Sequence, residues 1–359
     1  MSTNKTLISP LDQLKRDHAS HQREVNELQI KVNLSSIVDQ MEDINTKVVN
    51  LSKRIVDLRK RNYIFDTSLE KKAFDFHKNW QPIQTNLRIK INQEVNSLKI
   101  EMKNVESQLV KSSSNFQNIN FSRQILNSLN VQIKNLTEKV SASERMLRGL
   151  FDTFERELNI FHKNLSNIEW SLEAFETSNV KFFPHEFLIL AVKSVWTRDG
   201  DEDKDDPEGV LFLTDQRLIF EQKQEVATKK FLFITQESEI IQKILVDIPI
   251  KLVENVTPSK QGVFKNHDFL EIDFESGAQY AKTKFHLHNQ DCEDWKALIN
   301  RVISGDFDKN RTEEMDQEVV DQIKNAPTVC PQCGATIKVQ LIRGMDQITC
   351  EFCGAIIKL

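Results

Sequence analysis

Residues 30–58 read Ile30-Lys-Val-Asn-Leu34-Ser-Ser-Ile37-Val-Asp-Gln-Met41-Glu-Asp-Ile44-Asn-Thr-Lys-Val48-Val-Asn-Leu51-Ser-Lys-Arg-Ile55-Val-Asp-Leu58. The apolar residues of this stretch recur with alternating gaps of four and three. A period of about 3.5 residues over several heptads is typical of a coiled-coil seam. The same spacing recurs over 11–32, 95–109, 126–154 and 158–175, with slips near residues 30 and 154. Such slips are stutters, which locally change the winding. Residues 1–180 therefore predict an all-α coiled coil.

Turn-forming residues are scarce in the same half of the chain. It holds one of the nine glycines, Gly149, and two of the eight prolines, Pro10 and Pro82. Pro82 lacks the N–H that an interior helical residue donates, and the Lys-Ser-Ser-Ser-Asn run at 111–115 favours a loop. We therefore expect helices at about 10–80, 83–111 and 117–178. Folding back and parallel dimerisation both remain open, but a buried seam needs a partner surface, which favours a homo-oligomer.

The two halves of the chain differ in charge. Residues 1–180 carry 26 Lys+Arg and 22 Asp+Glu, a net +4, whereas residues 181–359 carry 22 and 31, a net −9. Neither half has the strongly basic composition of a protein that works mainly on nucleic acid. The basic run Arg54, Arg59, Lys60, Arg61 is interspersed with acids, which favours a solvated helix face over a phosphate or membrane site. No apolar run reaches the ~20 residues that span a bilayer, and no secretory signal is evident, so a cytoplasmic location is expected.

The periodicity changes at Phe182, where strand-forming residues replace the heptads. Residues 210–220 predict a hairpin that turns at 214–217. Strands are also expected at 187–196, 230–235, 244–248, 251–258, 269–274 and 284–288. A helix over Asp291–Ile303, capped by Asn289 or Asp291, presents Trp295, Leu298, Ile299 and Val302 on one face. Residues 181–305 thus predict a small β-barrel or sandwich capped by one helix.

Three segments of this region resemble a known family. Gly209-Val-Leu-Phe-Leu-Thr-Asp-Gln-Arg-Leu-Ile-Phe220 is similar to the signature hairpin of GRAM domains, which belong to the pleckstrin-homology-like (PH-like) superfold. Asp247-Ile-Pro-Ile-Lys-Leu-Val253 resembles the strand and turn that follow, and Phe285 with the helix from Asp291 resembles the closing segment. The resemblance covers about 182–305. It implies binding of lipid headgroups or of protein partners, without catalysis.

The segment 199–208 departs from the lipid-binding members of that superfold. It reads Asp-Gly-Asp-Glu-Asp-Lys-Asp-Asp-Pro-Glu, with seven acids and one base, where many lipid-binding relatives carry basic residues. Such a loop repels an anionic headgroup. It also fails as a calcium-binding EF-hand, because Lys204 and Val210 stand where glycine and a bidentate glutamate are needed. A solvated acidic loop is the preferred interpretation, with loose Ca²⁺ attraction and a basic partner protein as alternatives.

The histidines and the lone cysteine before residue 305 do not form a recognisable catalytic site. His18 and His21 fall on seam positions, and His286 and His288 share one strand face without an apparent third ligand. Cys292 is a lone thiol without an identifiable base. The chain also lacks a phosphate-binding loop, a G-x-S-x-G motif, an H-E-x-x-H motif and a dinucleotide fingerprint. We therefore expect no enzymatic activity.

The C-terminal residues carry a metal-binding pattern. The pattern is Cys330-Pro-Gln-Cys333-Gly followed by Cys350-Glu-Phe-Cys353-Gly, with 16 residues between Cys333 and Cys350. Two Cys-x-x-Cys pairs supply four thiolates, which predicts a closed, structural Cys₄ zinc site with one ion per chain. We expect a hairpin from strands at 337–342 and 347–349 that turns at Arg343-Gly344. Rubredoxin-type iron is the main alternative metal, although the spacer is short for it and the aromatic core is missing.

The sequence therefore divides into a coiled coil over 1–180, a GRAM or PH-like domain over 181–305, a linker with a short helix (312–325) over 306–326, and a zinc ribbon over 327–359. The predicted function is that of a non-enzymatic cytoplasmic scaffold or adaptor. It would self-associate through the coiled coil and dock protein partners through the other two modules. The alternatives are peripheral membrane binding and, more weakly, nucleic-acid binding through the ribbon, whose basic residues are only Lys338, Arg343 and Lys358.

Overall fold

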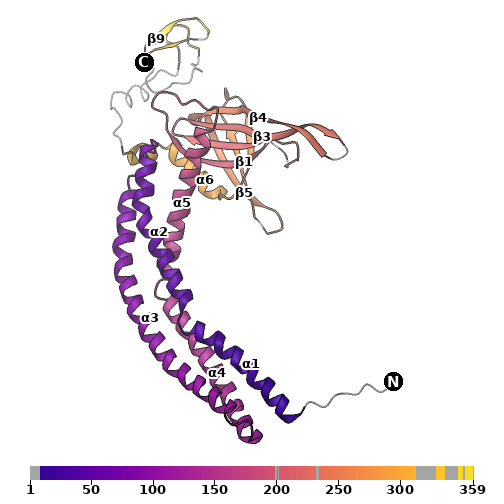
Figure 1. The fold of residues 1–359 in the computed structure, drawn as a ribbon. Coiled ribbons are helices and arrows are strands. Elements are labelled where there is room, and N and C mark those ends of the chain that lie inside the picture. Colours follow the sequence, from indigo (N-terminus) through magenta and orange to yellow (C-terminus); the bar gives the residue numbers. More distant parts are fainter. Residues whose placement is uncertain are drawn as a thin grey trace. The chain divides into compact units, whose positions relative to one another are not determined.

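The computed structural model (Figure 1) describes residues 9–198, 200, 202–231, 234–264, 266–312, 329–335, 347–350 and 352–358, with the backbone alone for 226–231 and 234–239. The chain forms two compact units. The first comprises Met1–Ser52 and Lys71–His162, and the second comprises Lys53–Glu70 and Lys163–Leu359. No helix in the described part of the chain combines the length and the apolar character needed to cross a membrane.

The first unit consists of α-helices. The five long helices of the chain are α1 (Pro10–Lys31), α2 (Ser35–Lys60), α3 (Leu69–Ser113), α4 (Ile119–Arg148) and α5 (Asp152–Glu176), and the second unit takes in the C-terminal ends of α2 and α5. Side-chain caps mark two of the starts: Ser9 accepts from the Asp12 N–H before α1, and Asn118 accepts from the Phe121 N–H before α4. Pro10 occupies the first turn of α1, where a missing N–H costs little.

The helix boundaries differ from the expected ones. The predicted helix over 10–80 is three helices, because the backbone turns at Leu34 (φ 51°) and again at Asn62 and Asp66 (φ 61° and 55°). The predicted helix over 117–178 ends at Arg148 and restarts at Asp152. The breaks at 32–34 and 149–151 lie close to the two heptad slips. A slip in the apolar pattern therefore coincides here with an interruption of the helix and not only with a change in winding.

Pro82 does not break its helix, which corrects the expected boundary at 80–83. Helix α3 runs through Pro82 to Ser113. Aromatic side chains anchor the turns of the helix just before this position, because the Trp80 indole stacks on Phe154 with ring centroids 5.2 Å apart and donates to Asn45. Phe76, one turn earlier, stacks on Phe161 at 5.3 Å. Buried aromatic packing thus offsets the loss of a helical hydrogen bond at proline.

Replacing Pro82 with alanine is expected to stabilise the helical unit by about 1–3 kcal/mol, because alanine restores the missing N–H and removes the clash with the preceding turn. Urea unfolding of the full chain followed by helical circular dichroism measures the change. Gln81→Ala, at the exposed neighbour, is the control and should change little. A Pro82→Ala chain less stable than wild type would contradict this account of α3.

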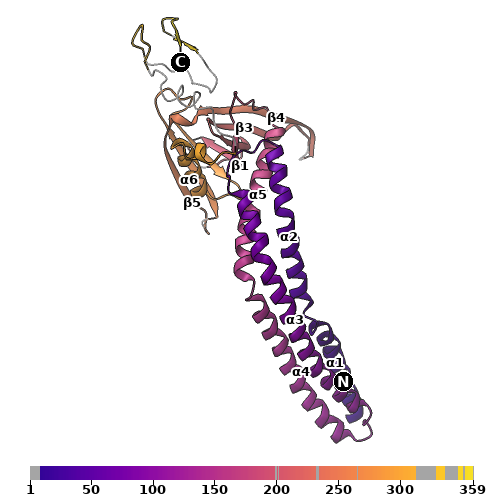
Figure 2. The ribbon, with the colours of Figure 1, turned by 90° about the vertical axis from the view of Figure 1, so that its left-hand side faces the viewer.

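The heptad seam is buried within a single chain. Most of its apolar residues are buried, among them Leu14, Leu28, Ile37, Ile44, Leu51, Leu98, Met102, Leu126, Leu129, Ile133 and Leu136, whereas Ile30, at the first slip, is 68% exposed. Cross-helix contacts give the helix directions. Glu42 meets Arg88 and Asn45 meets Trp80, so α3 runs opposite to α2, and Glu94 meets Ser143 while Glu101 meets Lys139, so α3 also runs opposite to α4 (Figure 2). The segments therefore fold back, and the seam has its partner surface without a second chain.

The second unit contains one seven-stranded antiparallel sheet in the order β4-β3-β2-β1-β7-β6-β5. Its strands are β1 (Leu188–Arg198), β2 (Glu208–Thr214), β3 (Arg217–Phe231), β4 (Ile234–Pro249), β5 (Val253–Gln261), β6 (His267–Phe274) and β7 (Lys282–Leu287), with a 3₁₀ turn at Ile250–Leu252. Helix α6 (Cys292–Ile303) packs on β5 and β6, and a second 3₁₀ turn follows at Asp306–Asn310. The expected order of a helical region followed by antiparallel strands and one helix is confirmed.

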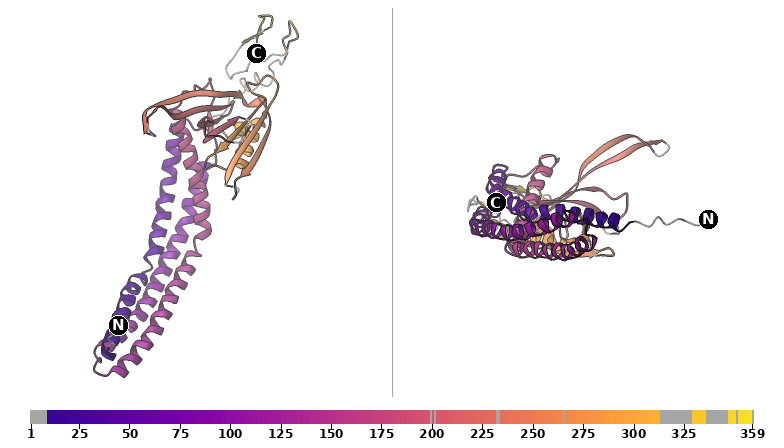
Figure 3. Two further views of the ribbon diagram at one scale, coloured as in Figure 1. Left: turned by 90° about the vertical axis from the view of Figure 1, so that its right-hand side faces the viewer. Right: turned by 60° about the horizontal axis from the view of Figure 1, so that its bottom comes forward.

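Two details of the sheet differ from expectation. The segment 230–235 is not a separate strand but joins the ends of β3 and β4, which form a long hairpin that extends past the other strands (Figure 3). The described strands pair as one sheet with β4 and β5 at its edges, so the closed barrel stays a prediction. The interior is apolar: Phe212, Phe220, Phe285 and Trp295 are at most 1% exposed. Asp291 caps α6 by accepting from the N–H groups of Glu293 and Asp294, as one of the two expected capping residues.

The β2–β3 hairpin needs a glycine at its start. A Cβ atom on Gly209 would lie 1.9 Å from the carbonyl oxygen of Glu221 and 2.8 Å from the Cα of Gln222. Gly209 is paired with Gln222 across the two strands. The absence of a side chain therefore allows the β2 and β3 backbones to approach each other at this point.

Polar contacts join α5 to the sheet and to the end of α2 within the second unit. The Ser171 hydroxyl in α5 accepts from the Ala191 N–H at 2.7 Å and donates to the Asn167 carbonyl at 2.6 Å. Arg54 forms a two-pronged pair with Glu169, and Arg61 pairs with Glu176 at 2.8 Å. Arg59 also donates to Glu70 and to three backbone carbonyls. Arg54, Arg59 and Arg61, which the sequence assigns to a solvated helix face, therefore all have partners within this unit.

The C-terminal residues form short paired strands, β8 (Gln347–Thr349) and β9 (Ile356–Lys358). The expected strand at 347–349 is confirmed, and its described partner is β9. The expected strand at 337–342, the turn at Arg343-Gly344 and the linker helix at 312–325, apart from Thr312, lie outside the described residues.

Candidate metal centre

The four predicted cysteine ligands lie together. The Sγ atoms of Cys330 and Cys353 are 3.7 Å apart, as are those of Cys333 and Cys350. All four Sγ atoms lie within 4.8 Å of one another. Tetrahedral zinc with Zn–S bonds of about 2.3 Å requires S···S distances of about 3.8 Å. The cluster is therefore compatible with one tetrahedral ion held by all four thiolates.

Two equivalent turns position these ligands. In the first, the Gly334 N–H donates to the Cys330 carbonyl at 2.9 Å and the Cys330 N–H donates to the Ala335 carbonyl at 2.8 Å. In the second, Gly354 and Cys350 make the matching bonds at 2.9 Å. Gly334 and Gly354 have φ of 73° and 72°, a left-handed conformation that glycine adopts without strain. The glycine after each Cys-x-x-Cys pair is thus explained by the backbone of the turn.

The surroundings favour the thiolate form of Cys330, whereas the pKa values of the Cys333 and Cys353 thiols are raised, in part through hydrogen bonds with neighbouring thiols. Donation from the N–H groups of Cys333 and Gln332 lowers the pKa of the Cys330 thiol to about 7, which favours the metal-binding form. The buried cluster here consists of Cys330, Ile348, Cys350 and Ile357, with Ala355 packed against it. Among the residues that the structure describes this core is small, so a bound metal would supply part of the folding free energy of the ribbon. The donor set fits zinc, and iron stays the alternative.

The remaining cysteine is placed as a structural thiol. Cys292 is buried at the start of α6 and its Sγ donates to the Ser259 carbonyl at 3.7 Å. It lies near Asp268 and Asp291, but the Lys260 ammonium pairs with both carboxylates. A cation therefore already occupies the place a metal would take. Burial, together with the nearby Asp268, raises the pKa of the Cys292 thiol to about 11.

Alkylation of Cys292 in the native, zinc-loaded chain is expected to be at least about 100-fold slower than that of a free cysteine at pH 8. A rise in pKa of about two units lowers the thiolate fraction by about that factor, and burial slows it further. Mass spectrometry after timed iodoacetamide treatment measures it. Rapid modification in the folded chain would contradict the assignment and reopen a nucleophilic role.

A buried ionic network was not anticipated from the sequence, although two of its residues, Thr214 and Arg217, lie in the 209–220 hairpin segment. Arg217, 3% exposed, donates to both carboxylate oxygens of Glu186 at 2.9 and 2.7 Å and to Asp247 at 2.7 Å. Its guanidinium lies over the Phe183 ring at 3.8 Å. Thr214 also donates to Glu186. The motif Thr214-Asp215-Gln216-Arg217 therefore organises the junction between the approach to β1 and the strands β3 and β4, which is a structural role.

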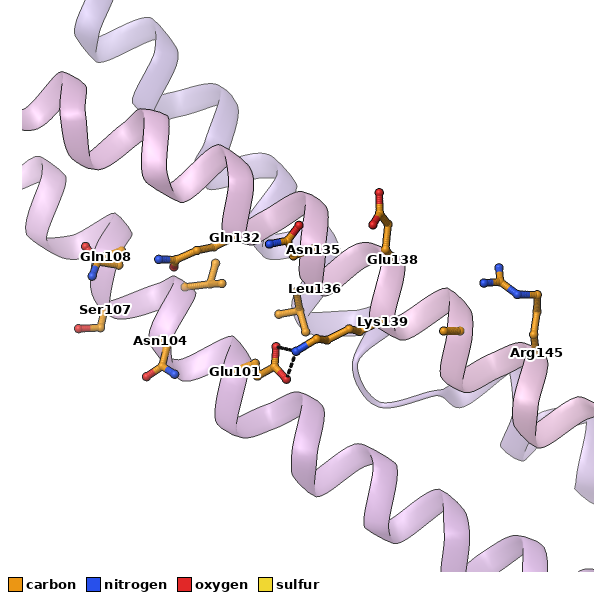
Figure 4. Close-up of a pocket in the computed structure, with 12 residues that line it drawn as sticks. Glu101, Asn104, Ser107, Gln108, Gln132, Asn135, Leu136, Glu138, Lys139 and Arg145 are labelled. Carbon is orange, nitrogen blue, oxygen red and sulfur yellow. Dashed lines mark hydrogen bonds and ion pairs between the residues drawn. The ribbon is translucent and has the colours of Figure 1, made fainter.

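A polar groove lies between α3 and α4 of the first unit (Figure 4). The Glu101–Lys139 ion pair crosses it, with Nζ–O distances of 2.7 and 2.8 Å. Its described lining residues include no histidine or cysteine. The lining does include Ser107, Glu101 and Glu138, which are residue types that can act as nucleophile or general base, but Glu101 is engaged by Lys139.

Comparison with known proteins gives no family. No family model matches the chain, and no curated protein matches it. Among solved structures, the Vps36 N-terminal PH domain is similar over 36% of this chain and 88% of its own length, with 15% identity and a TM-score of 0.25. The PDZ-RhoGEF DH/PH domains, in complex with GTP-γ-S-activated RhoA, are similar over 84% of this chain and 96% of their own, with 12% identity and a TM-score of 0.23. Structural similarity with TM-scores this low does not establish a family or a function for this chain.

Proposed function

We propose that this chain is a non-enzymatic adaptor that docks protein partners through a GRAM-type, PH-like sheet domain and a zinc ribbon. The observation that carries this proposal is the filled interior of the sheet domain. Phe212, Phe220, Phe285 and Trp295 occupy the space that a substrate pocket would need. A domain with a packed interior acts through its surface, and the four-cysteine centre, closed around its metal, has a structural rather than a catalytic role.

The tip of the β5–β6 hairpin is the docking element that the structure favours. Val263 and Phe264 are 94% and 87% exposed there, next to Gly262 with φ 86°. Two adjacent exposed apolar side chains at a loop tip are a natural anchor for a partner's apolar pocket. Lys260, near the same tip, pairs with Asp268 and Asp291, so this lysine is not free to bind an anionic membrane.

The test is capture of partners from native cells by the full-length chain and by a Val263→Asp/Phe264→Asp variant. A protein retained by wild type and lost by the variant supports the proposal. Ile240→Asp, at another exposed apolar position (69% exposed), is the matched control and should retain the partner. If all three chains bind the same partners equally, the hairpin tip is not part of the docking surface.

Membrane binding is the alternative that the same hairpin allows. Co-sedimentation of the full chain with phosphatidylserine-containing vesicles tests it, and loss of sedimentation in the Val263→Asp/Phe264→Asp variant would favour it over protein docking. Self-association stays a prediction, and light scattering tests it. Nucleic-acid binding through the ribbon is disfavoured by the net charge of −9 over 181–359, from 22 Lys+Arg and 31 Asp+Glu.

A further inference from the structure

Three histidines gather on one face of the sheet where β6 and β7 pair. His286 lies opposite Phe269, and Asp268 lies opposite Leu287. This register places His267 across from His288, and all three imidazoles on the same face, because side chains alternate along a strand. The ring centroid of His286 lies 5.1 Å from that of His267 and 4.6 Å from that of His288. The sequence shows His286 and His288 as a pair, and the pairing of β6 with β7 adds His267.

The spacing of two ring nitrogens matches a metal chelate. His267 Nδ1 and His286 Nε2 are 3.3 Å apart. Two imidazoles on one tetrahedral zinc ion, with Zn–N bonds of about 2.0–2.1 Å, hold their nitrogens about 3.3–3.4 Å apart. In the metal-free protein the same distance suits a hydrogen bond from His267 Nδ1–H to His286 Nε2. The two histidine side chains would therefore need to move little between the metal-free and the metal-bound form.

Glu202 fixes the tautomer that such a site needs. Its carboxylate lies 2.6 Å from His286 Nδ1. An ionised carboxylate accepts, so His286 carries its proton on Nδ1 and presents the Nε2 lone pair toward His267. A carboxylate behind a ligating histidine is the usual outer partner of protein-bound zinc. The acidic segment 199–208 thus acquires a specific role, because it supplies this carboxylate.

The site is open on one side and supported on the other. His267 is exposed, which gives an ion access, whereas the His286 side chain is 8% exposed and its ring stacks on Phe269 at 4.6 Å. Gly262 leaves room for the His267 ring, since a Cβ there would lie 2.5 Å from the ring carbon Cδ2. Near His288, the carboxylates of Glu202 and Glu208 oppose the charge of Lys193. The local charge is therefore compatible with a bound cation.

We propose that His267 and His286 bind a second divalent metal ion of the imidazole-preferring class (Zn²⁺, Ni²⁺, Cu²⁺), with Glu202 as the positioning residue behind His286. This site is separate from the four-cysteine centre and independent of the adaptor proposal. Two protein ligands leave the remaining coordination positions to water or to a side chain of a bound partner.

The test is zinc stoichiometry of the full-length chain by equilibrium dialysis at stepped free Zn²⁺, with metal analysis. We expect two ions per chain in wild type, of which the weaker is lost in His267→Gln and His286→Gln. Glu202→Gln should weaken that ion about 10–100-fold. His77→Gln, at an exposed histidine of α3, is the control and should keep both ions.

Two results would overturn the proposal. One is a single zinc ion per chain at every free Zn²⁺ concentration, which would leave only the hydrogen bond between the two histidines. The other is a second ion that His267→Gln does not remove. His267 is exposed, so its substitution tests the site even if the more buried His286→Gln chain does not fold, and thermal unfolding of each variant reports folding directly.

Discussion

Serine in place of Cys350 is expected to release the metal from the four-cysteine centre and to unfold the ribbon. Structural zinc in small metal-folded domains contributes an apparent ~10–16 kcal/mol, and a hydroxyl does not replace a thiolate ligand. Among the described residues, the buried cluster around the site has Ile348 and Ile357 beside its two cysteines, so a bound metal is expected to contribute to holding β8 and β9 together.

Metal analysis after washing with a chelator of intermediate strength, which removes weakly held ions, measures this effect. Wild type should keep about one zinc ion per chain, and Cys350→Ser should keep close to none. Cys292→Ser is the matched control, because Cys292 is a buried thiol outside the cluster, and it should keep the ion. A wild-type ribbon that stays folded without metal would contradict the prediction, and iron in place of zinc would correct the identity of the ion.

Replacing Arg217 with methionine is expected to destabilise the sheet domain by about 3–5 kcal/mol, because it leaves a buried charge without its partner. Glu186 is 4% exposed and would lose both of its Arg217 hydrogen bonds. Burial already raises the pKa of Asp247 against the lowering effect of Arg217. Loss of Arg217 should raise that pKa further.

The sign of the pH effect follows from this shift. A carboxyl whose folded pKa lies above its unfolded value binds more protons in the folded state. Stability in Arg217→Met should therefore fall more steeply than in wild type as the pH rises above the normal aspartate range near 3.8. Urea unfolding followed by tryptophan fluorescence between pH 4 and 7 measures both the loss and its slope.

Two further variants separate the buried network from general effects of lost charge. Arg217→Met combined with Glu186→Gln should recover part of the stability, since the uncompensated charge is removed. Lys282→Met, which breaks exposed pairs with Glu271 and Asp273, should change little. Equal losses in Arg217→Met and Lys282→Met would contradict a special role for the buried pair.

The local features of this protein follow from its sequence. The heptad spacing and the single glycine before residue 180 predict helices, and the structure confirms helices there. The two Cys-x-x-Cys-Gly units predict the cysteine cluster and its paired turns, and those four residues do lie together. The helices and the two Cys-x-x-Cys-Gly turns depend on residues within one or two turns of each other, so short-range spacing suffices to predict them. The cluster joins cysteines 17 and 23 positions apart, and it could be predicted because the two units together form one metal-binding motif.

Long-range packing decided the rest. Whether the helical seam is covered by the same chain or by another depends on the turns at 32–34, 61–68 and 114–118, and spacing alone leaves both arrangements open. Helix α3 passes through Pro82 because Trp80 and Phe76 find Phe154 and Phe161, which are about 80 residues away in the chain. His267 meets His286, and Arg217 meets Glu186, only through strand pairing and chain reversal. These contacts join residues about 20 or more positions apart, and their free energy depends on which surfaces the folded chain buries together, a quantity that no local period contains.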